Sequence, residues 1–142
     1  MARAATTRTP AQMFALVFGV VYLLIGIVGF AVTGFDEFAG STFNEKLLVF
    51  PLNPLHNIVH LAVGALWVAS SRRHDAAKNV NTIIGVVYLL TAVLGFAGLL
   101  EWLAIEGGAD GADNWLHLAS GALSLYFGTA GATVARRPAA AA

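Results

Sequence analysis

The sequence predicts an all-α protein, a polytopic membrane four-helix bundle made of two repeated helical hairpins with the N- and C-termini cytoplasmic. Three observations predict it: the composition, four apolar runs flanked by unevenly distributed basic residues, and an internal repeat. Hydrophobic residues make up 58% of the chain and charged residues only 11%, with a mean hydropathy of +0.74. A soluble domain of 142 residues could not bury so much apolar surface, so lipid is the expected solvent.

Polar segments separate the four apolar runs, and each run approaches the roughly 20 residues that cross a hydrocarbon core of about 30 Å. The predicted membrane domain covers residues 11–136, with spans at about 11–33, 54–71, 81–100 and 115–135. Residues 1–10 and 137–142 are predicted to be cytoplasmic tails.

Helix-start signals precede the second and fourth runs. Asn53 can cap free amides, and Pro54 at the first helical position loses no hydrogen bond. Asp113 or Asn114 is the expected cap of the fourth span. The apolar segment 47–50 is too short to cross and is expected to lie at the membrane interface.

Basic residues set the predicted orientation. Seven of the eight Lys and Arg residues lie on the side of both termini, and only Lys46 lies on the other side. By the positive-inside rule both termini are cytoplasmic, in a protein of the plasma membrane, with Trp102 as an outer headgroup anchor. The zero net charge argues against nucleic acid as a partner. The absence of cysteine excludes disulfides and thiol chemistry.

The two halves of the chain repeat each other. The string 19–24 recurs as 85–90, and 29–31 as 95–97, both at an offset of 66. The second and fourth spans share Asn-x-x-His-Leu-Ala-x-Gly-Ala-Leu at an offset of 57. Such a parallel repeat predicts a pseudo-two-fold axis along the membrane normal. Stripes of small residues in each half are expected to pack at that axis.

The second span carries polar residues in its first turns. His56, Asn57 and His60 share one helix face, since they lie three and four residues apart. Asn114 and His117 repeat part of this pattern on the fourth span. His60 is expected about 9 Å below the outer helix end. A polar cluster near the outer face is therefore predicted.

Three readings of this cluster are open, and the first two are an interhelical clamp and a haem site. In the first, His60 forms an interhelical clamp by bonding Asn114 or His117 across the bundle. In the second, His60 and His117 hold a b-type haem between them, with Gly64 and Gly121 one turn deeper leaving room.

A metal site is the third reading. His56, His60 and His117 would supply three imidazoles, which suit zinc or copper. A fourth ligand or an outer partner would come from the nearby acids, Asp110, Asp113 or Glu45.

Other conspicuous polar groups are expected to stay apart from the cluster. Side chains lean toward the N-terminus of their helix, so Tyr22 and Tyr88 should lean away from His60 and His117. His74 is expected to be solvated in a short polar inner link.

The chain shows no nucleophile–base pair, phosphate loop or pair of catalytic carboxylates. The leading prediction is a non-enzymatic structural or interaction protein without a cofactor, with the lipid bilayer, a membrane protein or a second copy of itself as partner. A metal- or haem-binding module is the alternative. A transporter of small solutes is the third reading, and only a few hydroxyl side chains support it: Ser120, Ser124, Thr91 and the two tyrosines.

The string Asn53-Pro54-Leu55-His56-Asn57-Ile58-Val59-His60 with Gly64, together with Asn114-x-x-His117-x-x-x-Gly121, resembles a bacterial membrane-protein family, domain of unknown function 4383. The resemblance covers residues 11–136. It implies a four-span protein, mainly of actinobacteria, and it implies no activity.

Overall fold

A computed structural model describes residues 7–41 and 43–133. The predicted tails at 1–6 and 137–142, Arg3, Arg136, Arg137 and the end of the fourth predicted span lie outside these residues. The described part contains four helices and two short strands: α1 (Pro10–Thr33), β1 (Lys46–Leu47), β2 (Phe50–Pro51), α2 (Pro54–Ser70), α3 (His74–Phe96) and α4 (Ala112–Gly128). The predicted all-α class is confirmed, and α1 and α3 are long and apolar enough to cross a membrane.

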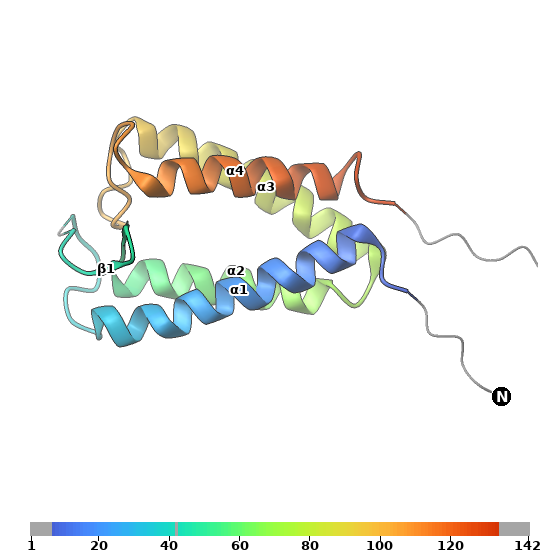
Figure 1. The fold of residues 1–142 in the computed structure, drawn as a ribbon, viewed down its shortest axis with the longest axis horizontal. Helices are drawn as coiled ribbons and strands as arrows, with labels where there is room; N and C mark the ends of the chain where they lie inside the picture. Colours follow the sequence, from blue (N-terminus) through green and yellow to red (C-terminus); the bar gives the residue numbers. More distant parts are fainter. Residues whose placement is uncertain (1–6, 42, 134–142) are drawn as a thin grey trace, which may run out of the picture.

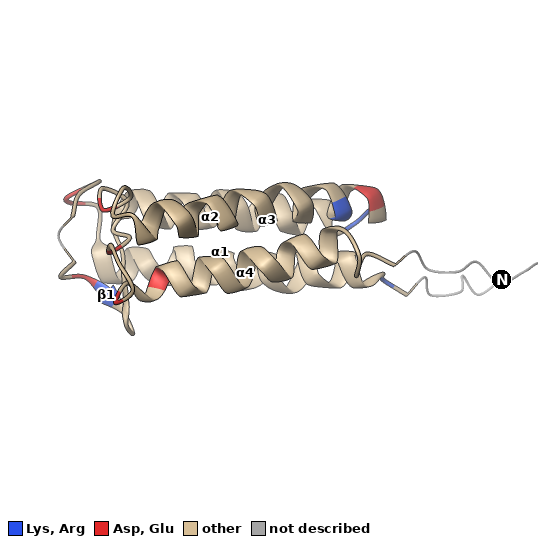
Figure 2. Cartoon of the chain, turned by 90° about the horizontal axis from the view of Figure 1, so that it is seen from above, with Lys and Arg blue, Asp and Glu red and all other residues tan. Residues whose placement is uncertain are grey.

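The helices form two antiparallel hairpins, α1–α2 and α3–α4, which lie one above the other in Figure 1. The loops 34–53 and 97–111 lie together at one end, called here the outer end. The start of α1 and the end of α4 lie at the opposite, inner end. Figure 2 shows the Lys, Arg, Asp and Glu residues gathered at the two ends, with uncharged helix between them. One exception is the first turn of α4, which carries Asp113.

The second helix starts as the sequence predicts. Asn53 is the N-cap of α2, its side-chain oxygen accepts a hydrogen bond from the His56 amide at 2.8 Å, and Pro54 is the first helical residue. The prediction for α4 is wrong, because its N-cap is Gly111 and neither Asp113 nor Asn114 precedes the helix. A side chain at position 111 would overlap the Glu106 carbonyl, so glycine alone allows the loop to approach so closely.

Glycines set the distance between helices within each hairpin. A Cβ on Gly64 would meet Leu23 N at 2.8 Å and Gly19 O at 2.9 Å, so the α1 and α2 backbones are in direct contact there. These glycines pack inside the hairpins, whereas the sequence suggested packing at the axis between them. Gly64 also leaves no room for a cofactor, because α1 occupies the space beside it.

The same contact recurs in the second hairpin. A Cβ on Gly121 would meet Leu89 N at 2.9 Å and Gly85 O at 3.2 Å. Each partner is shifted by the offset of its own repeat: 57 for the second helix of the hairpin and 66 for the first. The sequence repeat is therefore also a repeat of helix packing.

One buried residue connects all four helices at the inner half. Asn81 of α3 donates to the Ala11 carbonyl of α1 at 3.1 Å and accepts from the Trp67 indole of α2 at 3.0 Å. Its backbone carbonyl accepts from the Ser124 hydroxyl of α4 at 2.8 Å. The first two bonds join the two hairpins, and the third joins α4 to α3 within the second hairpin.

The inner link predicted at 74–80 belongs to α3, which begins at His74, about two turns before the predicted third span. His74 is not simply solvated. Its Nδ1 lies 2.9 Å from the hydroxyl of Thr9, the N-cap of α1, and the ring is half-buried. Only a three-residue turn separates α2 from α3, which brings the start of α3 against the start of α1.

The outer loops are joined to each other. The Gly40 amide and the Asn53 side chain both donate to the Trp102 carbonyl at 3.0 Å. Residues 46–51 form a β-hairpin with Leu48 at its tip, where φ is +62° and the side chain is 86% exposed. The apolar segment 47–50 therefore forms a hairpin, of which β1 contacts α1 and β2 contacts α4.

Candidate functional site

Three histidines come together at the outer half of the bundle, as the sequence predicts. His56 and His60 lie on α2 and His117 on α4. The ring centroids of His56 and His60 are 4.4 Å apart, and those of His56 and His117 are 6.2 Å apart. All three rings are at most 7% exposed. The two hairpins thus meet through imidazole rings, which we call the histidine cluster.

The two tyrosines contact this cluster, so the prediction that they lean away from it is wrong. Tyr22 meets His60 edge-on at 5.2 Å, and Tyr88 meets His117 in the same geometry at 5.1 Å. The two tyrosine rings lie 5.8 Å apart. The contact of Gly64 with the α1 backbone sets how far α2 is shifted along α1, and it places His60 at the same height in the bundle as Tyr22. This alignment of the two helices has a larger effect than the tilt of side chains toward the N-terminus of their helix.

The repeat is broken at one position that sequence reasoning did not single out. At the offset of 57, His56 corresponds to Asp113, so α2 presents two histidines four residues apart where α4 presents Asp113 and His117. The His117 Nδ1 lies 2.7 Å from the Asp113 carbonyl oxygen. A carbonyl only accepts, so Nδ1 carries the proton, and in the neutral ring Nε2 holds the lone pair.

The two predicted asparagines have structural roles beside the cluster. Asn57 donates to the Thr33 hydroxyl, and Asn114 donates to the carbonyls of Glu106 and Gly108, each at 2.9 Å. The side-chain oxygen of Asn57 faces Gly29 of α1, where a Cβ would overlap it. Asn114 repeats this contact at the equivalent glycine of α3. Asn57 thus joins α2 to the end of α1, and Asn114 joins α4 to the outer loop 97–111.

The predicted clamp between the hairpins is therefore wrong in its partners. Within the described residues no hydrogen bond joins His60 to Asn114 or His117, and Asn114 is committed to backbone carbonyls. Buried side-chain atoms without a partner gather at this end of the molecule: His56 Nδ1, Asn57 Oδ1, His60 Nδ1, Asp113 Oδ2 and Asn114 Oδ1. The two asparagine oxygens are closed in against glycines of their own hairpins, whereas His60 and Asp113 line a pocket.

Asp113 is the one carboxyl group among these residues. Its side chain is 3% exposed and precedes the apolar run that begins at Trp115. The carboxyl group is buried at the edge of the pocket, and neither Lys nor Arg is among the residues that line it. A carboxyl group donates a hydrogen bond when it is protonated and only accepts hydrogen bonds when it is ionised.

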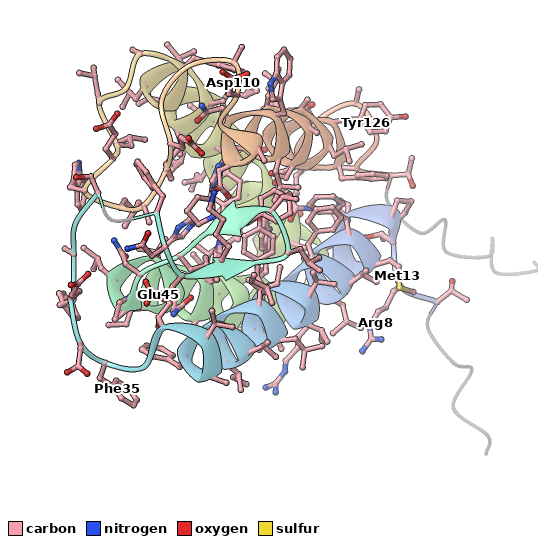
Figure 3. All side chains as sticks on the ribbon, turned by 60° about the vertical axis from the view of Figure 1, so that its left-hand side comes forward. Arg8, Met13, Phe35, Glu45, Asp110 and Tyr126 are labelled. Atoms are coloured by element: carbon pink, nitrogen blue, oxygen red, sulfur yellow. The ribbon has the colours of Figure 1, made fainter. Side chains whose placement is uncertain are left out.

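An apolar pocket of about 340 Å³ adjoins the cluster. Its walls come from α1, α4 and the β-hairpin, which lies across the front of the bundle in Figure 3. Four polar side chains also line the pocket: His60, Asp113, His117 and Ser120. The sequence did not reveal this pocket, because the β-hairpin that covers it has no repeat partner and no motif of its own.

Whether the cluster can bind a metal ion depends on where the His, Asp and Glu side chains lie. Among the described residues no group of three or more His, Asp or Glu side chains is arranged to hold a metal ion. Glu45 and Asp110, two of the predicted additional ligands, are exposed on the outer loops (Figure 3). Asp113 alone of the three predicted acids lines the pocket with His60 and His117.

Fold and site define a small helical bundle with two helices fit to cross a membrane and a buried histidine cluster at its outer end. The chain belongs to the family described as Domain of unknown function (DUF4383), which it matches over residues 12–130. No curated protein and no solved structure matches it.

Proposed function

We propose that this chain is a four-span protein of the plasma membrane with both termini cytoplasmic, and that it acts as a non-enzymatic binding module whose site is the histidine cluster. The side chains on the outward faces of all four helices support the proposal of four membrane spans. They carry aliphatic and aromatic side chains, whereas the helices bury glycine, asparagine, serine, tyrosine and histidine. Lipid-solvated helices pack through small and polar residues in this way. Helices α2 and α4, of 17 residues each, are about 25 Å long.

Single cysteines test the topology, since the chain has no cysteine of its own. Ser41→Cys and Asp110→Cys replace exposed residues of the two outer loops, and Arg72→Cys replaces an exposed residue of the inner turn. We expect a membrane-impermeant maleimide to label the two outer cysteines in spheroplasts, and Arg72→Cys only after permeabilisation. Labelling of Arg72→Cys in sealed spheroplasts would contradict the four-span arrangement.

The binding role rests on one observation: two members of the histidine cluster, His56 and His60, and the neighbouring Asp113 each bury a polar atom without a hydrogen-bond partner. Leaving such an atom unpaired costs about 1–3 kcal/mol. Unpaired polar groups are typical of sites where a ligand supplies the missing partner.

Apolar substitution separates a binding site from a structural clamp. We expect His60→Leu to raise the melting temperature of the purified protein in detergent by a few degrees, because it removes an unpaired buried polar atom. Asn81→Leu is the matched control and should lower the melting temperature, since both ends of the Asn81 amide are paired. Loss of stability in both variants would show that His60 has a structural role.

A metal ion at the cluster is the second candidate. The hydrogen bond from His117 Nδ1 to the Asp113 carbonyl favours it, because a backbone carbonyl commonly orients a ligand histidine in this way. Metal analysis and absorption spectra of the purified protein test it. Stoichiometric zinc or copper, lost in His60→Ala and His117→Ala, would establish this candidate.

A transport role receives less support from the packing. Below the cluster the rings of Tyr22, Tyr88 and Trp67 contact one another at 5.1–6.0 Å and are at most 5% exposed. This aromatic layer lies between the histidines and the inner end, so within the described part of the bundle a solute would have to pass three buried rings.

A further inference from the structure

The pocket beside the histidine cluster has two chemically different parts. Its walls are aliphatic and aromatic: Phe18, Val21, Ile25, Leu47, Leu48, Phe50, Leu52 and Leu116. Its polar side chains are nine-tenths buried or more, and two of them, His60 and Asp113, have an atom without a partner. A ligand that satisfies both parts has a long apolar portion and a small polar head.

The rim of this pocket reaches the surface that faces lipid. Val21 of α1 is 45% exposed, Leu116 of α4 is 40% exposed, and Leu48 at the hairpin tip is 86% exposed. The entrance thus opens between α1 and α4 under the β-hairpin. A ligand that enters there comes from the bilayer and keeps its apolar portion out of water.

We propose that this pocket binds a neutral single-chain amphiphile from the bilayer, with its hydroxyl or carbonyl head at His60 and Asp113 and its hydrocarbon chain between α1 and α4. The inference rests on the proposed binding function and names its ligand class.

The pocket argues for a neutral head and for one chain. Neither Lys nor Arg lines it, and Asp113 is its one acidic residue, so a carboxylate or phosphate head would lie beside a carboxyl group without a compensating cation. A protonated Asp113 donates to a hydroxyl or carbonyl oxygen, and an imidazole nitrogen accepts from a hydroxyl. A volume of about 340 Å³ is at the lower end of the range for small-molecule sites, about 300–1,000 Å³, which suits one chain.

Photolabelling of the full-length protein in liposomes tests this ligand class. The probe is a long-chain fatty alcohol that carries a diazirine on its chain and a terminal alkyne. We expect saturable labelling of residues that line the pocket, displaced by the unlabelled alcohol. The fatty acid and the quaternary ammonium compound of the same chain should compete about tenfold less well, since either brings a charge into an apolar site. Equal competition by either charged compound would overturn the neutral head.

Two tryptophan variants on one helix supply the control. Ile25→Trp fills the pocket, whereas Ile27→Trp alters a lipid-facing side chain that is 60% exposed. We expect labelling to fall about tenfold in Ile25→Trp and to be unchanged in Ile27→Trp, with both proteins monodisperse and equally helical. Equal labelling of both variants, or labels scattered over the outer helix faces, would show general lipid contact and overturn the proposal. The stability gain of His60→Leu is measured without the probe, so it reports on the binding function separately.

Discussion

Gly64→Leu is expected to prevent the first hairpin from closing. A Cβ at this position would already meet backbone atoms of Leu23 and Gly19 at 2.8 and 2.9 Å, and a leucine adds three more carbons. Backbone atoms cannot rotate away as a side-chain end can, so α1 and α2 must separate. We expect a loss of about 3 kcal/mol or more in the free energy of unfolding, at the upper end for overpacked positions. Chemical denaturation in mixed micelles, followed by circular dichroism, measures it.

The repeat extends this prediction to the second hairpin. Gly121→Leu should be destabilising to a similar or slightly smaller degree, because the equivalent backbone distances there are 2.9 and 3.2 Å. Gly40→Leu is the matched control, since nothing lies within 4 Å of a Cβ at that outer-loop glycine. A Gly64→Leu protein as stable as Gly40→Leu would contradict the direct backbone contact between α1 and α2.

Periodicity and the repeat predicted the helices, their pairing into hairpins and the meeting of His56, His60 and His117. These features depend on which residues are apolar and on which positions recur, and both are visible in one sequence. The axial shift of one helix relative to its neighbour depends on which glycine meets which backbone atom. For this reason the sequence placed Tyr22 away from His60, although the two rings are in contact.

The pocket was beyond sequence reasoning for a related cause. The segment 47–50 was expected at the interface from its hydropathy, but its β-hairpin depends on a left-handed residue, Leu48, which has no strong preference for that conformation. The sequence showed Asp113 as one of several acidic residues near the histidines. Only the comparison at the offset of 57 shows that it takes the place of His56 in the second repeat. Differences between the two repeats are thus as informative as their identities.

The centre of the bundle depends on another such difference. Trp67 corresponds to Ser124 at the same offset, so one hairpin contributes a large ring where the other contributes a hydroxyl, and both bond Asn81. A second tryptophan at position 124 would compete with Trp67 for the same space between the hairpins. The unequal pair lets one indole fill the space between the hairpins.

Trp67→Ala is therefore expected to be the most destabilising truncation to alanine in the inner half. The ring is fully buried, lies edge-on to Phe14, Phe18, Tyr22 and Tyr88 at 5.1–6.0 Å, and donates to Asn81. Removing a buried tryptophan costs about 3–5 kcal/mol through lost packing and the remaining cavity. Trp67→Phe keeps most of the packing and loses the hydrogen bond, which averages about 0.6 kcal/mol inside membrane proteins.

Denaturation of these two variants beside Trp102→Ala measures the contribution of the buried ring. Trp102 is 52% exposed, so its truncation should change the free energy of unfolding by less than about 1 kcal/mol. A double-mutant cycle of Trp67→Phe with Asn81→Leu isolates the hydrogen bond and should give a coupling of about 0.6–1.7 kcal/mol. If Trp67→Ala cost no more than Trp102→Ala, the two hairpins would not be held together by this ring. The aromatic layer would then not form the floor of the histidine cluster, and the argument against a polar path to the inner end would fail with it.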